Sequence, residues 1–419
     1  MLTDMTKTST PRVRAVAASA VLATAVLAGC SSGIAPHEQA AAAGESETAA
    51  PVEASGATPR LAVSYDGGVL VLDAHSLAVV GQVPVDGFTR LNPAGDGRHV
   101  LVTSGGAFEV LDAGTWSEPH GDHAHHYTAP PALTGTEFAA NKPGHVVRHA
   151  GRTALFHDGS GLVEMFDPHE LAGGKPAVDS HTTAVPHHGV AVELENGGLI
   201  TTLGDEKVRT GIVVLDRERR EVTRNEQCPG VHGEAAAANG VVVFGCQDGV
   251  LVYRDGAVTK ISSPDAYGRI GNQAGADTSD VVLGDYKTDR DAELERPQRV
   301  MLVNTTTAAM TPVDLGTSYT FRSLGRGPRG EALVLGTDGI LHVIDQNTGA
   351  VINRIPVLGA WSEPEKWQSP RPALFVDGGT AYVSDPAARS IHAIDLAAGV
   401  VVRSAALPQS PIELTGVGG

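Results

Sequence analysis

The sequence predicts an all-β protein, a β-propeller of eight four-stranded blades, with seven blades as the alternative. Three observations predict this class: a repeated hairpin unit, glycine turns between short apolar runs, and a spare strand at the C-terminus. No long segment shows the 3.6-residue hydrophobic period of an amphipathic helix, so an all-β chain is favoured over alternating strands and helices. Two stacked β-sandwiches are the other all-β arrangement that the pattern allows.

The repeat becomes visible when short apolar runs that end in a turn-forming residue are aligned. Their spacing averages about 46 residues, which is typical of a propeller blade and too long for leucine-rich, ankyrin or tetratricopeptide repeats. If the irregular sixth unit is an insertion, the number of blades falls to seven. The eight runs are 71–73, 110–112, 165–167, 214–216, 252–254, 302–304, 343–345 and 393–395.

Turns and chain ends support the same class. Glycine supplies the positive φ that a tight hairpin needs, and Asp-Gly pairs occur between apolar runs at 66–67, 158–159 and 248–249. The first unit lacks the strand that should precede Leu61, whereas the chain ends with a spare apolar segment at 411–414. We therefore expect the C-terminal strand to close the propeller ring, because closure leaves no unpaired sheet edge.

Residues 1–29 have the pattern of a bacterial lipoprotein signal peptide. Basic residues precede an uncharged stretch at 15–27 that is too short to span a bilayer comfortably. The stretch ends in Leu-Ala-Gly-Cys, which looks like a lipobox, so we expect lipidation at Cys30. A diacylglyceryl group adds two acyl chains and would anchor the protein to the membrane.

Residues 30–58 consist mostly of Ala, Glu, Ser, Gly and Pro and predict a disordered tether, because they contain too little apolar surface to fold. The propeller domain is expected over 59–419. The protein should therefore lie outside the cytoplasm, on the periplasmic or cell-wall side of the membrane, and contact the membrane only through its lipid.

Composition excludes several functions. The formal net charge is −17 with the acidic residues spread along the chain, which argues against a nucleic-acid partner. An aromatic content of 4% argues against repeated quinone or sugar docking surfaces, and no phosphate loop or nucleophile elbow is present. We expect a monomer that is not an enzyme.

The cysteines predict one disulfide. Once Cys30 carries lipid, Cys228 and Cys246 remain as an even pair in an oxidising compartment. Two thiolate zinc ligands are the alternative, which would need a reducing site.

Histidine is concentrated in the second unit, where four of the seven residues 120–126 are histidine. His120, His123 and His125 are spaced so that a glycine-containing loop can turn their imidazoles toward one point, and imidazole is a common zinc ligand. His126 is a further candidate ligand, and Asp122 could ligate or orient an imidazole. This pattern predicts a metal site on a mobile loop.

Other histidines occupy an equivalent place in successive units. His145, His188 and His232 each stand near the start of the expected innermost strand of blades three, four and five. These starts share one face of a propeller and crowd around its centre. We therefore expect the three to meet the histidine loop of blade two in one shared site. A second, weaker site among His145, His149 and His157 is also compatible with the sequence.

The donor set favours zinc. Beyond the signal peptide the chain has three methionines, all scattered, so a soft Cu(I) site is disfavoured. Imidazoles with at most one carboxylate suit zinc best, with Cu(II) or Ni(II) as alternatives.

Four segments, 91–99, 118–127, 186–191 and 229–235, resemble the AztD-type zinc metallochaperones, which are encoded with zinc-uptake ABC transporters. The histidine segment 118–127 is the most specific, and the likeness runs from about residue 59 to the end. The resemblance implies an extracytoplasmic protein that binds zinc through histidines and passes it to the solute-binding protein of the importer. It does not assign the ligands residue by residue.

Two other functions stay open. One is a propeller metalloenzyme, in which Glu118 or Glu234 would be the general base. The other is a protein-binding scaffold whose histidines are incidental. A charged insertion at 285–295 in the sixth unit is a candidate contact with a partner.

Overall fold

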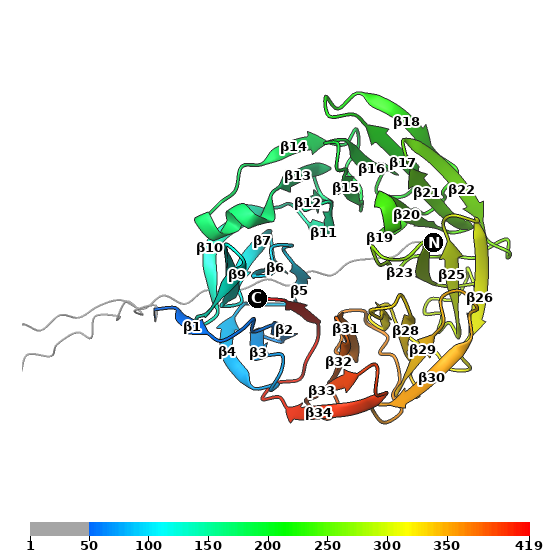
Figure 1. The fold of residues 1–419 in the computed structure, drawn as a ribbon. Helices are drawn as coiled ribbons and strands as arrows, with labels where there is room; N and C mark the ends of the chain where they lie inside the picture. The colour runs from blue at the N-terminus through cyan, green and yellow to red at the C-terminus, as the bar shows by residue number, and fades with distance from the viewer. Residues whose placement is uncertain (1–49) are drawn as a thin grey trace, which may run out of the picture. The chain divides into compact units, whose positions relative to one another are not determined.

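The computed structural model describes residues 50–419, which form a propeller ring of small antiparallel sheets (Figure 1). The predicted all-β propeller is confirmed. The expected signal peptide at 1–29, the lipidation site Cys30 and most of the expected tether lie outside the described residues. Within residues 50–419, none of the helices has the length and apolar character needed to cross a membrane.

Within the described residues, eight sheets have four strands each, and we number them blades 1 to 8 along the chain. The strands of each blade are given from the centre of the propeller ring to its rim. Blade 1 consists of β35 (Leu414–Val417), β2 (Arg60–Tyr65), β3 (Gly68–Asp73) and β4 (Val79–Pro84), and blade 2 of β5 (Arg90–Pro93), β6 (His99–Ser104), β7 (Ala107–Asp112) and β10 (Ala132–Ala139). Blade 3 consists of β11 (Pro143–His149), β12 (Arg152–His157), β13 (Leu162–Phe166) and β14 (Asp179–Thr182), and blade 4 of β15 (Ala191–Glu193), β16 (Leu199–Gly204), β17 (Arg209–Leu215) and β18 (Glu221–Asn225).

Blades 5 to 8 follow in the same order. Blade 5 consists of β19 (His232–Ala237), β20 (Val241–Cys246), β21 (Gly249–Arg254) and β22 (Ala257–Ser262), and blade 6 of β23 (Gln273–Ala274), β24 (Val281–Asp285), β25 (Arg299–Asn304) and β26 (Ala309–Asp314). Blade 7 consists of β27 (Leu324–Arg326), β28 (Ala332–Leu335), β29 (Ile340–Ile344) and β30 (Val351–Pro356), and blade 8 of β31 (Ala373–Asp377), β32 (Thr380–Asp385), β33 (Ser390–Asp395) and β34 (Val400–Ala406). Residues 50–419 also contain two short 3-10 helices, η1 (Pro168–Gly173) between β13 and β14 of blade 3 and η2 (Ala238–Gly240) between β19 and β20 of blade 5.

Packing between adjacent blades makes the core. The second strands β2 and β20 are buried along their whole length, because both of their faces are covered by neighbouring blades. One apolar cluster joins Val147 of blade 3, Ile200 of blade 4 and Phe244 of blade 5. Burying such side chains stabilises the fold by roughly 1.5–3 kcal/mol each. The blades therefore hold the inner strands of blades 3 to 5 in fixed positions.

The C-terminal strand completes blade 1, as expected, but it lies three residues later than the expected 411–414. Strand β35 pairs antiparallel with β2. Pro411 has no backbone N–H to donate. The Glu413 side chain turns inward, accepts the Leu91 backbone N–H at 3.1 Å and pairs with Arg322 at 2.7 Å. These side-chain contacts tie the end of the chain to blades 2 and 7.

An additional three-stranded sheet is formed largely by the segment that connects the third and fourth strands of blade 2. Strands β8 (Thr115–His120) and β9 (His123–Thr128) form a hairpin, and β1 (Val52–Ala54) pairs with the free edge of β9. The expected tether at 30–58 is therefore wrong at its C-terminal end, which is ordered from Val52. Backbone hydrogen bonds to a sheet edge order this segment without the apolar burial that its composition lacks.

The predicted disulfide between Cys228 and Cys246 is present, and both side chains are fully buried. It joins the segment before β19 to the end of β20, so it holds the start of the inner strand of blade 5. Because the sulfurs are bonded to each other, the alternative of two thiolate zinc ligands does not apply.

Replacing both cysteines with alanine is expected to lower the free energy of unfolding by about 3 kcal/mol, because the cross-link restricts a loop of the unfolded chain. Denaturant unfolding of the wild-type and double-variant proteins measures this loss. An unchanged unfolding midpoint at unchanged m-value would contradict it.

Candidate metal centres

The β8–β9 hairpin brings three histidines together near its tip. Gly121, with a φ of +63°, makes the turn that places His120 opposite His123. The imidazole centroids of His120, His123 and His125 lie 5.1–5.4 Å apart, and Nε2 of His125 is 3.4 Å from Nδ1 of His120. One ligand atom from each residue lies within 4.8 Å of the others. We call this group the hairpin site.

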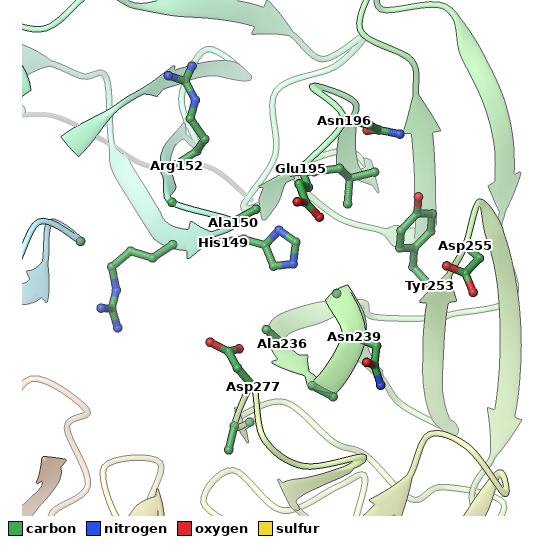
Figure 2. Close-up of a pocket in the computed structure, with 18 of the residues that line it drawn as sticks. His149, Ala150, Arg152, Glu195, Asn196, Ala236, Asn239, Tyr253, Asp255 and Asp277 are labelled. Carbon is green, nitrogen blue, oxygen red and sulfur yellow. The ribbon is translucent and has the colours of Figure 1, made fainter. Parts of the chain in front are cut away.

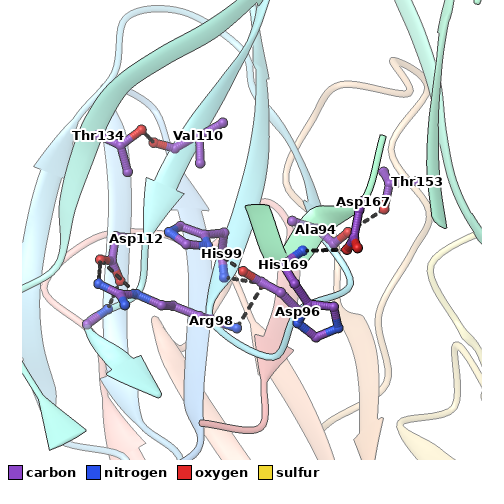
Figure 3. Close-up of polar contacts among 11 residues, drawn as sticks. Ala94, Asp96, Arg98, His99, Val110, Asp112, Thr134, Thr153, Asp167 and His169 are labelled. Atoms are coloured by element: carbon purple, nitrogen blue, oxygen red, sulfur yellow. Dashed lines mark hydrogen bonds and ion pairs between the residues drawn. The ribbon is translucent and has the colours of Figure 1, made fainter. Parts of the chain in front are cut away.

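Side-chain contacts hold the base of the hairpin. The Arg98 guanidinium lies over the Trp116 ring at 4.0 Å, and Trp116 stacks on Tyr127 of β9. Figure 3 shows Arg98 bonded to Asp112, while Asp96 accepts the backbone N–H groups of Arg98 and the following residue. The expectation of a loop is therefore wrong: the histidines lie on a paired β-hairpin with a stacked base.

Two carboxylates contact the imidazoles of the hairpin site. Asp122 lies 3.2 Å from Nδ1 of His123, and Glu53 of β1 lies 2.7 Å from Nδ1 of His125. Each carboxylate accepts the Nδ1 proton and leaves Nε2 free for a metal. Sequence reasoning identified Asp122 but missed Glu53, because the pairing of β1 with β9 has no signal in the local sequence.

His126 does not join the hairpin site. Alternation along β9 places it on the opposite face from His123 and His125. There its Nδ1 lies 2.7 Å from the Ser117 hydroxyl. The expectation that His126 is a ligand with the other three is not supported by this arrangement.

A second group of histidines lies at the centre of the propeller ring. His145 of β11, His188 just before β15 and His232 at the start of β19 have imidazole centroids 4.9–5.4 Å apart. Nε2 of His188 is 3.3 Å from Nε2 of His145 and 3.2 Å from Nε2 of His232. We call this group the channel site.

Hydrogen bonds at the outer nitrogens determine which atoms face the centre of the channel site. Nδ1 of His188 donates to Asp158 at 2.6 Å, and Nδ1 of His232 donates to the Gly271 carbonyl at 2.6 Å. When both imidazoles are neutral, their Nε2 atoms therefore carry lone pairs rather than protons. Two lone pairs that face each other at 3.2 Å repel, and a cation between them removes the repulsion. This arrangement is compatible with a bound metal ion.

Burial keeps protons away from the channel site. Loss of hydration lowers the pKa of His232 to about 3 and holds the pKa of His145 well below its usual range. Neighbouring cations act in the same direction: Arg209 and Arg269 on His232, and Arg90 and Arg209 on His145. Both imidazoles are therefore neutral at pH 7, the form that binds metal.

These pKa shifts predict acid sensitivity of the zinc-free protein. An unfolded histidine takes up a proton near pH 6.5, whereas His145 and His232 stay neutral in the fold. Stability should therefore fall as the pH drops below about 6.5, by at most about 1.4 kcal/mol per pH unit for each histidine. Unfolding free energies between pH 7 and 5 measure the slope. We expect a shallower slope in H145A/H232A and an unchanged one in the exposed control H75A.

A cavity of about 330 Å³ opens onto the channel site. Its wall includes Arg90, Trp367 and, from the charged insertion at 285–295, Lys287 and Glu295. Three histidines would fill three positions of a tetrahedral zinc ion and would leave the fourth for a ligand that enters through this cavity. The insertion that the sequence marked as a candidate partner contact thus lies beside the candidate metal site.

The hairpin and channel groups are separate, which corrects the expectation of one shared site. Within residues 50–419 they form two distinct clusters, with no hydrogen bond or imidazole contact recorded between their members. The hairpin leaves blade 2 between β7 and β10, away from the inner strands, whereas β11, β15 and β19 line the centre (Figure 1).

The weaker site expected among His145, His149 and His157 does not form. His149 donates its Nδ1 proton to the Glu193 carbonyl and lines a different cavity of about 1210 Å³, shown in Figure 2. His157 is buried in blade 3 against Phe108, with Nε2 2.9 Å from Glu164.

The fold and the two histidine clusters define a β-propeller with two candidate metal centres. Comparison with known proteins agrees with this class. The chain is 24% identical over 363 residues to the zinc chaperone AztD of Citrobacter koseri, a match that covers 84% of each chain. The predicted resemblance is thereby confirmed. No protein-family model matches the chain.

Solved structures give the same result. The crystal structure of Citrobacter koseri AztD superposes with a TM-score of 0.75 at 25% identity, covering 87% of this chain and 99% of that chain. The apo structure of the same protein has a TM-score of 0.74. The dihydro-heme d1 dehydrogenase NirN, at 13% identity and a TM-score of 0.53 over 86% of this chain and 75% of its own, shares the fold alone.

Proposed function

We propose that the protein is an extracytoplasmic zinc metallochaperone that binds zinc at the channel and hairpin sites and delivers it to the solute-binding protein of a zinc ABC importer. The observation that carries the proposal is the channel site, where the Nε2 atoms of three histidines converge and two of them carry lone pairs. The likeness to a zinc chaperone supports zinc as the metal and transfer as the activity.

Transfer follows from the open position at the channel site. A donor group of the acceptor protein enters the cavity, takes the fourth position on zinc and then replaces the histidines one at a time. The outer hydrogen bonds to Asp158 and Gly271 keep the released imidazoles in place, so the emptied site is ready to bind again. Burial keeps His145 and His232 neutral, so these two ligands take up no proton at pH 7 when zinc leaves.

Export and lipidation at Cys30 belong to the same proposal. The buried disulfide is compatible with an oxidising compartment. A lipid anchor at the end of the N-terminal segment would keep the chaperone close to an importer in the same membrane, and the acceptor would not have to be found by diffusion through the whole compartment.

A transfer assay tests the proposal. Zinc-loaded protein is mixed with the zinc-free solute-binding protein, and the rate is compared with zinc loss to a small chelator. We expect transfer to the protein acceptor to be faster than spontaneous dissociation and to increase with acceptor concentration. A rate that equals spontaneous dissociation at every acceptor concentration would contradict direct delivery.

A metalloenzyme is the second candidate, and one observation favours it. The channel site leaves a coordination position open toward a cavity, which is also the geometry of a catalytic zinc. Glu234, two residues after His232 on β19, is the nearest candidate base along that strand, and burial raises its pKa to about 8. Turnover of an activated ester by the zinc-loaded protein, lost in E234Q, would support this function over delivery.

A further inference from the structure

Strand β1 brings a carboxylate to the hairpin site from outside blade 2. Glu53 is paired with Tyr127 in the β1–β9 register, so its side chain lies on the face of the sheet that carries His125. Oε1 of Glu53 is 2.7 Å from Nδ1 of His125. The contact joins a segment that precedes the propeller in the sequence to one of the three imidazoles of the site.

We propose that Glu53 is a positioning residue of the hairpin site and that zinc binding there and docking of β1 stabilise each other. The inference rests on the proposed function, because it takes zinc as the ligand of the hairpin histidines. Glu53 accepts the proton of His125 at Nδ1, which leaves the lone pair at Nε2, the atom that lies 3.4 Å from His120.

Zinc binding at the hairpin site and docking of β1 are coupled because other contacts hold β1 weakly. The strand has three residues with exposed or half-exposed side chains, and Val52 is 63% exposed. Apolar burial therefore contributes little, and the backbone pairing and the Glu53–His125 contact hold the strand. Zinc bound at Nε2 withdraws charge from the imidazole and strengthens its Nδ1–H bond to the carboxylate. By linkage, the docked strand raises zinc affinity by the same factor.

Asp122 contacts His123 in a similar way but has a different consequence. It lies in the turn of the hairpin itself, its side chain is fully exposed, and the contact is longer, at 3.2 Å. It orients one imidazole without attaching another part of the chain. Asp122 therefore serves as a comparison for Glu53, since both carboxylates touch the site and only Glu53 belongs to β1.

The first experiment measures zinc affinity at the hairpin site alone. All variants are made in the full mature chain with the channel site removed by H188A/H232A, and circular dichroism checks their fold. We expect E53A to weaken zinc binding about 10-fold and E53Q to weaken it less, since the amide oxygen still accepts the proton. E137A removes an equally negative, exposed side chain on β10 and should leave the affinity unchanged, which separates positioning from net charge.

The second experiment measures hydrogen exchange of the amides of 52–54 with and without zinc. We expect zinc to slow their exchange by the same factor of about 10 in the background protein and in D122A, but not in E53A. Zinc affinity of E53A within twofold of the background, or exchange at 52–54 that zinc does not change, would overturn the inference while the proposed function stands. Failure of the background protein to bind zinc at all would instead overturn zinc binding by the hairpin, and the inference with it.

Discussion

Replacing His188 and His232 with alanine is expected to weaken zinc binding at the channel site by at least about 100-fold. Loss of an outer partner of a metal-bound histidine already costs 10–100-fold, and this change removes two of three ligands. Titration against a chromophoric chelator, with the hairpin site removed by H120A/H123A, isolates the channel site. The variant should unfold at a similar denaturant concentration, because the His188 side chain is 45% exposed and the His232 imidazole has a pKa that burial lowers.

A matched control is the double change H75A/H169A, which deletes two exposed histidines outside both sites. Its zinc affinity should equal that of the wild-type protein. If H188A/H232A binds zinc within threefold of this control, the channel histidines are not the ligands, and the lone pairs that face one another must be satisfied in some other way.

Replacing His120 and His123 with alanine is expected to reduce the bound zinc from two ions to one and to leave the affinity of the channel site within twofold. The sites belong to different parts of the propeller ring, and their members do not touch one another within residues 50–419. Zinc content after dialysis gives the stoichiometry, and chelator competition gives the affinity of the remaining site.

The same variant distinguishes independent sites from one shared site. A 10-fold or larger loss of channel affinity in H120A/H123A would mean that the hairpin contributes to the channel site. The matching variant H188A/H232A should lose the other zinc ion, so that the combination of all four changes binds none. S117A, which removes a hydroxyl that contacts His126 and the Gly419 carbonyl on the opposite face, should retain both ions.

The fold was predictable because its signals are local and repeated. Each blade is recognisable in the sequence by an apolar run that ends in a turn residue. Because the first unit lacks a strand, the spare strand at the C-terminus was predicted to complete it. The exact position of that C-terminal strand was not predictable, since it depends on the ion pair between the Glu413 side chain and Arg322 of blade 7. The sequence likewise did not reveal that Val52–Ala54 form a strand, because an edge strand needs backbone partners more than apolar residues.

The sequence by itself determined the propeller class, the disulfide and the histidines that carry the candidate metal chemistry. An equivalent position in three blades marked His145, His188 and His232, whereas His126 was separated from His123 and His125 only by the strand pairing seen in the structure. Only the tertiary structure decided that these histidines form two sites, that Asp158, Gly271 and Glu53 hold their outer nitrogens, and that the hairpin is fixed at its base. Local patterns encode which residues a strand presents, whereas distances between blades depend on packing around the whole propeller ring.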